Sequence, residues 1–413
     1  MIYTDVDGSI CAPKGFAANG IHCGIRKNAT RKDLALIVSS VPATAAAVYT
    51  TNRVKAASLI VTKEHLATGT LRAIVCNSGN ANACTGAEGL ATAKGMATSA
   101  AAALAVDATQ VAVGSTGVIG VPLPIAPVEK GMAELVAGLR ANPAGADAAL
   151  AAIMTTDTHE KKFAFTFDCA GVTATLGGIV KGAGMIHPSM ATMLGFLTCD
   201  LTIEKDALDA ALKQATARSF NRVSVDGDTS TNDCVIVMAN GMAGNAPVAL
   251  GSPSYAVFEA ALTELCVRLA REVARDGEGA SHLLTCTVSG AKDESTAETL
   301  TKSIISSSLV KAAFFGADAN WGRILCAMGY SGADFDPQTV DVAFKSVAGE
   351  IAVCRKGASL PFDEEVAKKV LLENEVEILV SMSGGSACGN GAATAWGCDL
   401  TYDYVKINGD YRS

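Results

Sequence analysis

Short hydrophobic runs separated by Gly-rich or polar turns recur along the whole chain. Runs of this length bounded by turn residues predict buried strands, and the alternating pattern at residues 163–167 predicts a half-buried one. The predicted strands lie at residues 33–38, 45–49, 71–76, 111–113, 163–167, 173–180, 192–198 and 375–382. The end of the chain, residues 399–413, also alternates and carries three Tyr, which predicts a docked strand.

Longer amphipathic or Ala-rich segments lie between these runs and predict helices. In the clearest of them, Phe258, Leu262, Leu265 and Leu269 fall on one helical face. Pro127 stands at the start of another, where a missing backbone N–H costs nothing. The predicted helices lie at residues 89–105, 127–139, 203–218 and 254–275. Taken together, these patterns predict a protein of mixed α and β structure.

Composition narrows the class of protein. The 413 residues are 49% hydrophobic, which favours a compact core over disorder, and the formal net charge of −8 argues against a nucleic-acid partner. No hydrophobic run reaches the roughly 18 residues of a membrane span, and no secretory leader is recognisable at the start. We therefore expect a cytoplasmic protein without a membrane anchor, whose 13 Cys are reduced thiols.

The stretch at residues 181–194 suits neither a core strand nor a helix. Gly182 and Gly184 permit unusual backbone angles, and Pro188 restricts the residue before it. A small residue followed by Thr, as at Ala191–Thr192, suits self-cleavage. The Thr hydroxyl would attack the preceding carbonyl and end as an N-terminal nucleophile, with its own α-amine as base. The simpler alternative is a Gly-rich loop between two strands.

Other candidate sites remain open on local sequence alone. The turn at residues 114–120 follows a strand and presents backbone N–H groups, as in an oxyanion hole, but an ordinary tight turn fits equally. The acidic loop at residues 222–233 resembles a calcium loop but lacks its glycine position and final Glu, which favours Asx turns. Lys311 and Arg323 are consistent with surface charges or with a site.

Several long motifs in one order resemble the ornithine acetyltransferase family, the bifunctional glutamate N-acetyltransferases of arginine biosynthesis. The motifs cover residues 181–194, 222–233, 275–280 and 308–323, and the resemblance extends from about residue 12 to residue 413. It implies an α+β layered sandwich with sheets packed between helices. It also implies cleavage between Ala191 and Thr192 into fragments 1–191 and 192–413, which associate as a heterotetramer of two copies each.

The same resemblance assigns roles residue by residue. Thr192 is the nucleophile, and Thr116 with Gly117 forms the oxyanion hole. Substrate contacts are implied at Thr155, Lys181, Thr192, Glu278, Asn408 and Ser413, with Thr155 chosen among the hydroxyl residues 155–158. The implied reaction moves acetyl from N2-acetylornithine to glutamate through acetyl-Thr192, without a metal or cofactor, and acetyl-CoA is a further acetyl donor in bifunctional members.

Two alternatives are consistent with the sequence. The first is a related self-processing aminopeptidase or amidase, which would release its acyl group to water instead of glutamate. The second is a member without catalytic activity that binds an amino acid and stays uncut. Product analysis with and without glutamate separates the first alternative from acetyl transfer, and the length of the purified chain separates the second.

Overall fold

The computed structural model describes residues 2–187 and 193–410. The chain forms two compact units, each assembled from several parts of the sequence. The first unit comprises residues 1–182, 189–221 and 229–269, and the second comprises residues 183–188, 222–228 and 270–413. Both proposed fragments, 1–191 and 192–413, therefore contribute chain to the first unit.

The first unit contains strands β1 to β8 and β10, helices α1 to α5, and α6 as far as Leu269. Their bounds are β1 Thr4–Asp5, β2 Phe16–Ile21, β3 Leu34–Tyr49, α1 Ala57–His65, β4 Thr70–Asn77, α2 Gly86–Leu104, β5 Val111–Ser115, α3 Ala126–Ala137, α4 Pro143–Ile153, β6 Lys161–Cys169, β7 Val172–Lys181, β8 Leu194–Cys199, α5 Lys205–Arg218, β10 Cys234–Ala239 and α6 Pro253–Arg275.

The strands of the first unit form one sheet in the order β1-β6-β7-β8-β10-β3-β4-β5, with β2 paired to β3. The two strands predicted at residues 33–38 and 45–49 are one long strand, β3. Its first half pairs with β2, its second half pairs with β10, and its pairing with β4 is interrupted between Val38 and Ala43. The polar Ser39 and Ser40 that separate the two hydrophobic runs mark this irregularity and not a turn.

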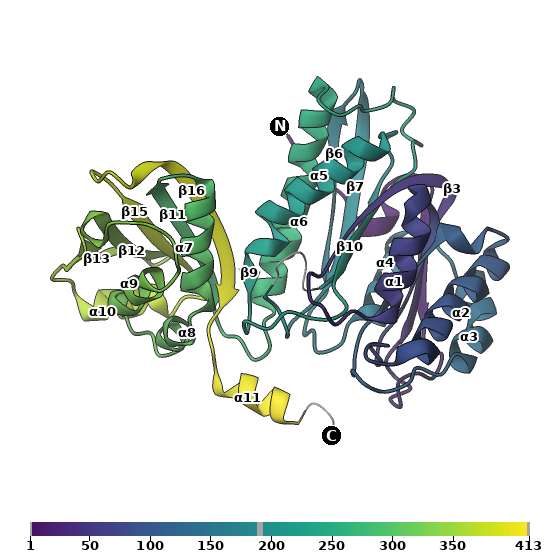
Figure 1. Ribbon diagram of the computed structural model, residues 1–413, viewed down its shortest axis with the longest axis horizontal. Helices are drawn as coiled ribbons and strands as arrows, with labels where there is room; N and C mark the ends of the chain where they lie inside the picture. Colours follow the sequence, from purple (N-terminus) through teal and green to yellow (C-terminus); the bar gives the residue numbers. More distant parts are fainter. Residues whose placement is uncertain (1, 188–192, 411–413) are drawn as a thin grey trace. The chain divides into compact units, whose positions relative to one another are not determined.

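Helices cover both faces of this sheet around β3 (Figure 1). Leu34 and Leu36 pack in a core with α2 and α3, whereas Ala35 and Ile37 pack in a second core with α4. Successive residues of a strand point to opposite faces, so a strand buried on both faces reads as a continuous hydrophobic run. This explains why the β3 sequence does not alternate.

Helix α6 packs against β7 at a glycine. A Cβ on Gly178 would lie 2.9 Å from Leu269 and 3.3 Å from Leu265, so only a residue without a side chain lets the helix approach this closely. The packing of α6 against β7 thus depends on a small residue, in agreement with the Ala- and Gly-rich sequence of the unit.

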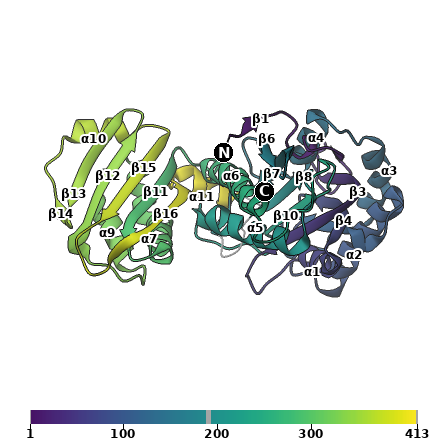
Figure 2. The same ribbon diagram turned by 90° about the horizontal axis from the view of Figure 1, so that it is seen from above.

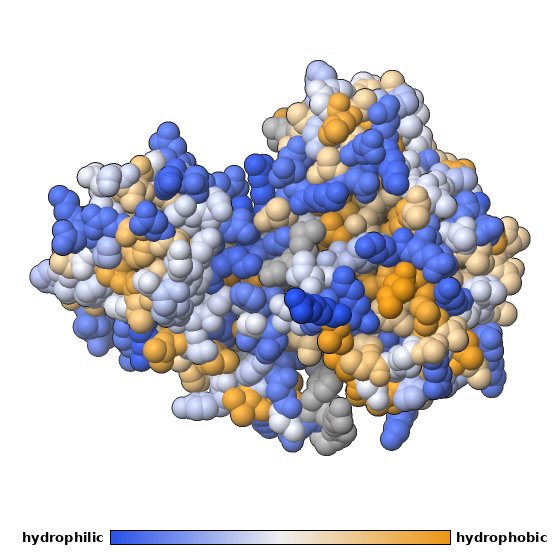
Figure 3. All heavy atoms as spheres, viewed as in Figure 1, coloured by the Kyte–Doolittle hydropathy of each residue, from blue (hydrophilic) through white to orange (hydrophobic). Residues whose placement is uncertain are grey.

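Hydrophobic side chains also gather at the surface over α1, where Val54 and Ile60 are exposed (Figure 3).

The second unit contains β9, β11 to β16 and α7 to α11. Their bounds are β9 Val223–Ser224, β11 Leu283–Ala291, α7 Glu294–Ser306, α8 Ser308–Phe315, α9 Trp321–Gly329, β12 Val340–Ser346, β13 Gly349–Arg355, β14 Ala358–Ser359, α10 Glu364–Leu371, β15 Glu375–Met382, β16 Cys388–Cys398 and α11 Tyr402–Gly409.

The strands of the second unit lie side by side in the order β14-β13-β12-β15-β11-β16-β9 (Figure 2). Alternate residues of β11, β12 and β15 enter one core with α7, α8, α9 and α10. Most of the intervening residues are polar, and Lys345 pairs with Glu377 at 3.0 Å across β12 and β15. The helices therefore cover one face of this sheet, and the other face is mainly polar.

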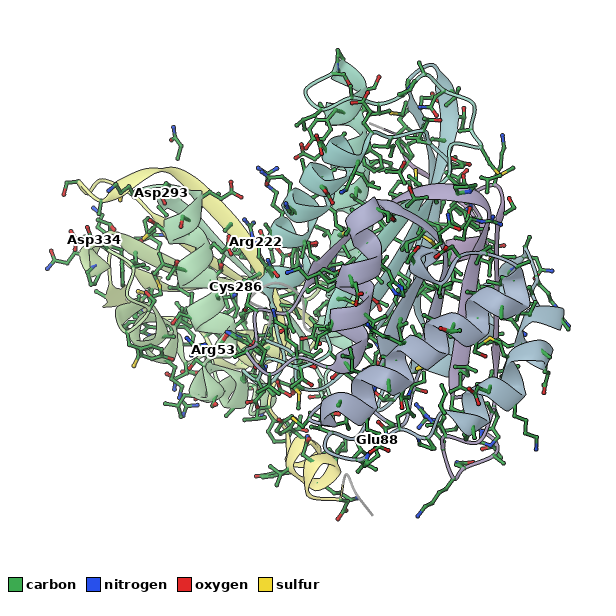
Figure 4. All side chains as sticks on the ribbon, turned by 45° about the vertical axis from the view of Figure 1, so that its right-hand side comes forward. Arg53, Glu88, Arg222, Cys286, Asp293 and Asp334 are labelled. Atoms are coloured by element: carbon green, nitrogen blue, oxygen red, sulfur yellow. The ribbon has the colours of Figure 1, made fainter. Side chains whose placement is uncertain are left out.

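Helix α7 begins at a capped end. The Asp293 side chain accepts a hydrogen bond from Thr296 N, and Figure 4 shows Asp293 at the start of the helix. Arg222 pairs with Glu294 at 2.7 Å and Glu298 at 3.3 Å, one turn apart on α7. These pairs anchor the segment around β9 to the rest of the second unit.

The predicted α+β class is confirmed, but the prediction for the chain end is wrong. Residues 402–409 form helix α11 and not a strand. The Thr401 hydroxyl accepts a hydrogen bond from Asp403 N, which is an N-cap that the alternating Tyr residues obscured. Within residues 2–187 and 193–410, no helix is long and apolar enough to cross a membrane.

Candidate active site

The Thr116–Gly117 turn follows β5 in the first unit and is held by backbone hydrogen bonds. Thr116 is buried, and its N–H donates to Asn77 O at 3.0 Å. Gly117 has φ +132°, and a Cβ there would lie 2.4 Å from the carbonyl carbon of Gly79. Only glycine fits both this angle and this approach. The turn is therefore a rigid, closely packed feature, as an oxyanion hole requires.

Lys181 ends β7 and is buried beside this turn. Its Nζ lies 3.4 Å from Thr116 Oγ1, although 65 positions separate the two residues in the sequence. Thr116 and Lys181 were predicted for different roles, and the structure brings them together. The arrangement places an ammonium group next to the hydroxyl and the backbone turn that follow β5.

Thr155 is connected to the same end of β7 by Asp157, a residue that was not predicted from the sequence. The N–H of Thr155 donates to Asp157 Oδ2 at 2.8 Å, and the N–H of Gly182 donates to Asp157 Oδ1 at 2.7 Å. Asp157 stands among hydroxyl residues that are typical of helix caps and turns, so no local signal separated it from them. One carboxylate therefore holds the backbones next to two predicted substrate contacts, Thr155 and Lys181.

Burial raises the pKa of Asp157, but the ammonium groups of Lys181 and Lys161 and the hydrogen bonds outweigh this effect and hold the pKa well below its usual range. Asp157 is therefore a carboxylate at neutral pH. Asp233, also buried in the first unit, differs because its Oδ2 has no hydrogen-bond partner among the described residues. Burial raises the pKa of Asp233 well above its ordinary value.

In the second unit, Glu278 lies against Ala183 and Gly184, which belong to the motif at residues 181–194. The N–H of Glu278 donates to Ala183 O at 2.9 Å, and a Cβ on Gly184 would lie 2.3 Å from the Glu278 carboxyl. A side chain at position 184 would therefore displace the Glu278 carboxyl from this place. Asn408 of α11 donates from Nδ2 to Glu278 Oε2 at 2.8 Å. Two predicted substrate contacts, Glu278 and Asn408, therefore meet within the second unit.

Asp226, which the sequence suggested only as a turn residue, holds the next part of the motif. Its carboxylate accepts hydrogen bonds from Met185 N at 2.6 Å and Ile186 N at 2.8 Å. Met185 adopts φ +57°, a strained angle for a side chain of this size. Tyr404 of α11 donates its hydroxyl to the same carboxylate at 3.3 Å, and burial together with Asp226 raises the pKa of Tyr404. Asp226 therefore fixes a strained backbone at Met185, a few residues before the predicted cleavage bond in the sequence.

His187, in the motif at residues 181–194, is half-buried. Its Nδ1 lies 3.1 Å from Ser224 Oγ and 3.4 Å from Ser306 Oγ, and burial lowers its pKa. Lys311, left open by the sequence, is buried and donates to the carbonyl of Cys398, so it has a structural role. Arg323 donates to Leu309 O at 2.8 Å from an exposed position.

Three predicted residues, Ala191, Thr192 and Ser413, lie outside the described residues. For the acidic loop at residues 222–233, the Asx-turn interpretation agrees with the hydrogen bond from Asp228 N to Asp226 at 3.3 Å. Within the described ranges, no group of three or more His, Cys, Asp or Glu residues is placed to hold a metal ion. The Asn232 side chain instead donates to Ala81 O and Ser115 O, next to the Thr116 turn.

The fold is of the α+β class, and the motifs that resemble ornithine acetyltransferases gather in it at residues 116–117, 155–157, 181–186 and 278. A family model described as the ArgJ family matches residues 17–413. The chain therefore belongs to the ArgJ family, and the resemblance stated from the sequence is confirmed.

Individual relatives agree with this assignment. The chain is 51% identical over 407 residues to the arginine biosynthesis bifunctional protein ArgJ of Symbiobacterium thermophilum, covering 98% of this chain and 99% of the relative. It is also 51% identical over 408 residues to the protein of the same name from Caldanaerobacter subterraneus, covering 99% of each. A solved structure of ornithine acetyltransferase with ornithine from Mycobacterium tuberculosis is 44% identical, covers 44% of this chain and 96% of that chain, and has a TM-score of 0.42.

Proposed function

We propose that this protein transfers an acetyl group from N2-acetylornithine to L-glutamate in arginine biosynthesis. The family match over residues 17–413 supports the reaction class. The observation that carries the proposal for the site is the 3.4 Å approach of Lys181 Nζ to Thr116 Oγ1. These two residues were assigned separately, as a substrate contact and as an oxyanion donor, and a shared active site requires them to be neighbours.

The chemistry proceeds in two half-reactions. The Thr192 hydroxyl oxygen attacks the acetyl carbonyl carbon, the amide C–N bond breaks, and the hydroxyl proton passes through the Thr192 α-amine to the departing ornithine amine. The α-amine of glutamate then attacks the resulting ester, and the hydroxyl of Thr192 is restored. Thr116 and Gly117 stabilise the oxyanion in both steps, and removal of one such donor typically lowers the rate about 10²–10³-fold.

The remaining contacts hold the amino-acid portion of the substrates. Lys181 provides a cation suited to a carboxylate, and Glu278 provides an anion suited to the amino group of ornithine. Thr155, Asn408 and Ser413 complete the proposed set of substrate contacts. Because the acetyl group travels on Thr192 itself, this mechanism requires no cofactor, and we include acetyl-CoA as a second acetyl donor because the relatives are named bifunctional.

Thr192 becomes an N-terminal residue in this mechanism only after cleavage of the Ala191–Thr192 bond. The two products, 1–191 and 192–413, remain associated, and we propose an assembly of two copies of each in the cytoplasm. The sheet order β7-β8-β10-β3 supports association, because β8 and β10 of the second fragment pair with β7 and β3 of the first.

The test is to incubate the purified protein with acetylornithine, with and without glutamate, and to analyse both the products and the protein by denaturing mass spectrometry. We expect two fragments, an acetyl adduct on residues 192–413, and N-acetylglutamate only when glutamate is present. The Thr192→Ala variant should remain one chain and lose activity at least about 10³-fold. A fully active uncut chain, or acetate released at the same rate without glutamate, would contradict the proposal.

A further inference from the structure

The Asp157 carboxylate joins two segments of the first unit, residues 155–161 and the end of β7 at Gly182. It accepts hydrogen bonds from Thr155 N at 2.8 Å and Gly182 N at 2.7 Å, and it forms an ion pair with Lys161 Nζ at 2.7 Å. Both side chains of the ion pair are completely buried. A buried carboxylate of this kind is stable only when its charge is compensated and its oxygens accept hydrogen bonds.

Two ammonium groups act on this one carboxylate. Lys161 forms the direct ion pair with Asp157, whereas Lys181 lowers the pKa of Asp157 through its charge and has its own hydrogen bond to Thr116 Oγ1 at 3.4 Å. In a water-poor interior the attraction between opposite charges is strong. A carboxylate not neutralised by Lys161 would attract the Lys181 ammonium away from Thr116.

We propose that the Lys161–Asp157 pair is a positioning device for substrate binding, in which Asp157 fixes the backbones beside Thr155 and Lys181 while Lys161 neutralises its charge and leaves Lys181 directed at Thr116 and the substrate. This inference rests on the proposed function, because it takes Lys181 as a substrate contact. Asp157 and Lys161 act through Lys181 and Thr155 and are positioning residues.

The consequence concerns binding more than chemistry. Acetylornithine and glutamate both carry an α-carboxylate, the group that the Lys181 ammonium is suited to bind. Displacement of Lys181 weakens the binding of both substrates equally in the ground state and in the transition state. Loss of such uniform binding raises KM and leaves kcat nearly unchanged.

The experiment compares three variants of the full chain. Lys161→Met removes the neutralising charge, Asp157→Asn/Lys161→Met removes both charges, and Lys162→Met is the matched control. Lys162 is the next residue, but it pairs with Asp147 at the surface, where the two side chains are 35% and 41% exposed. Rates are normalised to the fraction of cleaved protein measured by mass spectrometry.

We expect Lys161→Met to raise KM for both substrates about tenfold, equivalent to one weakened charged contact, with kcat within about threefold of the parent. The double variant should have KM values at least about threefold lower than those of Lys161→Met, because no unpaired carboxylate competes for Lys181. Lys162→Met should match the parent. A double change that restores binding is a result that a merely structural role does not produce.

The proposal is overturned if Lys161→Met leaves both KM values unchanged, if the loss falls on kcat alone, or if the double variant binds no better than Lys161→Met. Should Lys161→Met be insoluble, Lys161→Gln, which keeps a hydrogen-bond donor without the charge, takes its place in the same comparison. The acetyl adduct on residues 192–413 is measured in every sample. Absence of the adduct in the parent would refute the proposed function, whereas failure of the KM pattern with the adduct present refutes only this inference.

Discussion

Two aspartates hold successive parts of the same sequence motif, one in each unit, under different electrostatic conditions. Asp157 binds the N–H of Gly182 in the first unit, where it is buried and paired with Lys161. Asp226 binds the N–H groups of Met185 and Ile186 in the second unit, where it is half-buried. The buried aspartate thus has an ammonium partner, whereas partial exposure to water stabilises the other.

The difference shows how the cost of fixing a backbone depends on depth. A carboxylate that accepts two N–H groups holds a loop equally well in either place, but a buried carboxylate must also be neutralised. The first unit therefore uses a second side chain, Lys161, to neutralise the buried Asp157 carboxylate. The second unit adds the Tyr404 hydroxyl, a neutral donor, to Asp226. The predictions below test this difference, starting with the largest expected effect.

Removal of each carboxylate should destabilise the two sites unequally. Asp157→Ala leaves the Lys161 ammonium buried without this counter-charge, and we expect a loss of about 3–5 kcal/mol in the free energy of unfolding. Asp226→Ala removes hydrogen bonds at a half-buried position, and we expect about 1–2 kcal/mol. Urea denaturation of both variants at pH 7 measures the difference. Equal losses would show that burial of Asp157 carries no special electrostatic cost.

Asp226→Asn should slow the cleavage at Ala191–Thr192 without abolishing it. Asn keeps one acceptor oxygen, so only one of the two N–H groups of Met185 and Ile186 loses its partner, and the strained Met185 backbone is held less firmly. One hydrogen bond of about 1 kcal/mol corresponds to roughly a fivefold slower rate. The uncut fraction is followed over time by denaturing mass spectrometry after synthesis of the chain. Asp228→Asn in the same loop is the control. If Asp228→Asn slows cleavage as much as Asp226→Asn does, the hydrogen bonds of Asp226 have no special role in cleavage.

The smallest effect is expected at Asp233, and its sign is opposite to that at Asp157. The pKa of Asp157 is lowered by folding, so its contribution is present above about pH 3.9 and is lost as the pH falls. The pKa of Asp233 is raised, so the folded state loses stability relative to the unfolded state as the pH rises above about 3.9. Asp233→Asn should therefore be more stable than the parent at pH 8, by about 1 kcal/mol, and nearly equal to it at pH 4.

The comparison is made by urea denaturation of the parent and Asp233→Asn at both pH values. A variant less stable than the parent at pH 8 would mean that the Asp233 carboxyl is ionised and paired in the folded protein.

Most regular elements were predictable because hydrophobic periodicity reflects burial directly. Helix α6 and strand β4 agree with prediction to within a residue or so, since each has a clear pattern and clear ends. Strand β3 was divided because Ser39 and Ser40 interrupt its hydrophobic run inside the strand. Helix α11 was missed because Tyr402 and Tyr404 gave a strand-like alternation, whereas the cap at Thr401 signals a helix.

The site was predictable only as far as motif resemblance reaches. Thr116, Lys181, Glu278 and Asn408 were named from motifs, but their pairing at 3.4 Å and 2.8 Å depends on long-range folding that no local pattern encodes. Asp157 and Asp226 escaped because an aspartate in a turn-rich segment has many local uses, and only the structure shows which N–H groups it meets. The residues predicted to touch a substrate are marked by motifs, and the residues that hold them in place are not.

The interleaved strand order of the first unit constrains how the protein is made. Residues after 192 supply β8 and β10, which are inserted between β7 and β3 from the earlier part of the chain. A polypeptide ending at residue 191 would expose two unpaired strand edges and an open gap in its core, a state prone to aggregation. If the chain is cut at the proposed bond, this strand order requires that it folds intact first, and two separately synthesised halves should reassemble poorly.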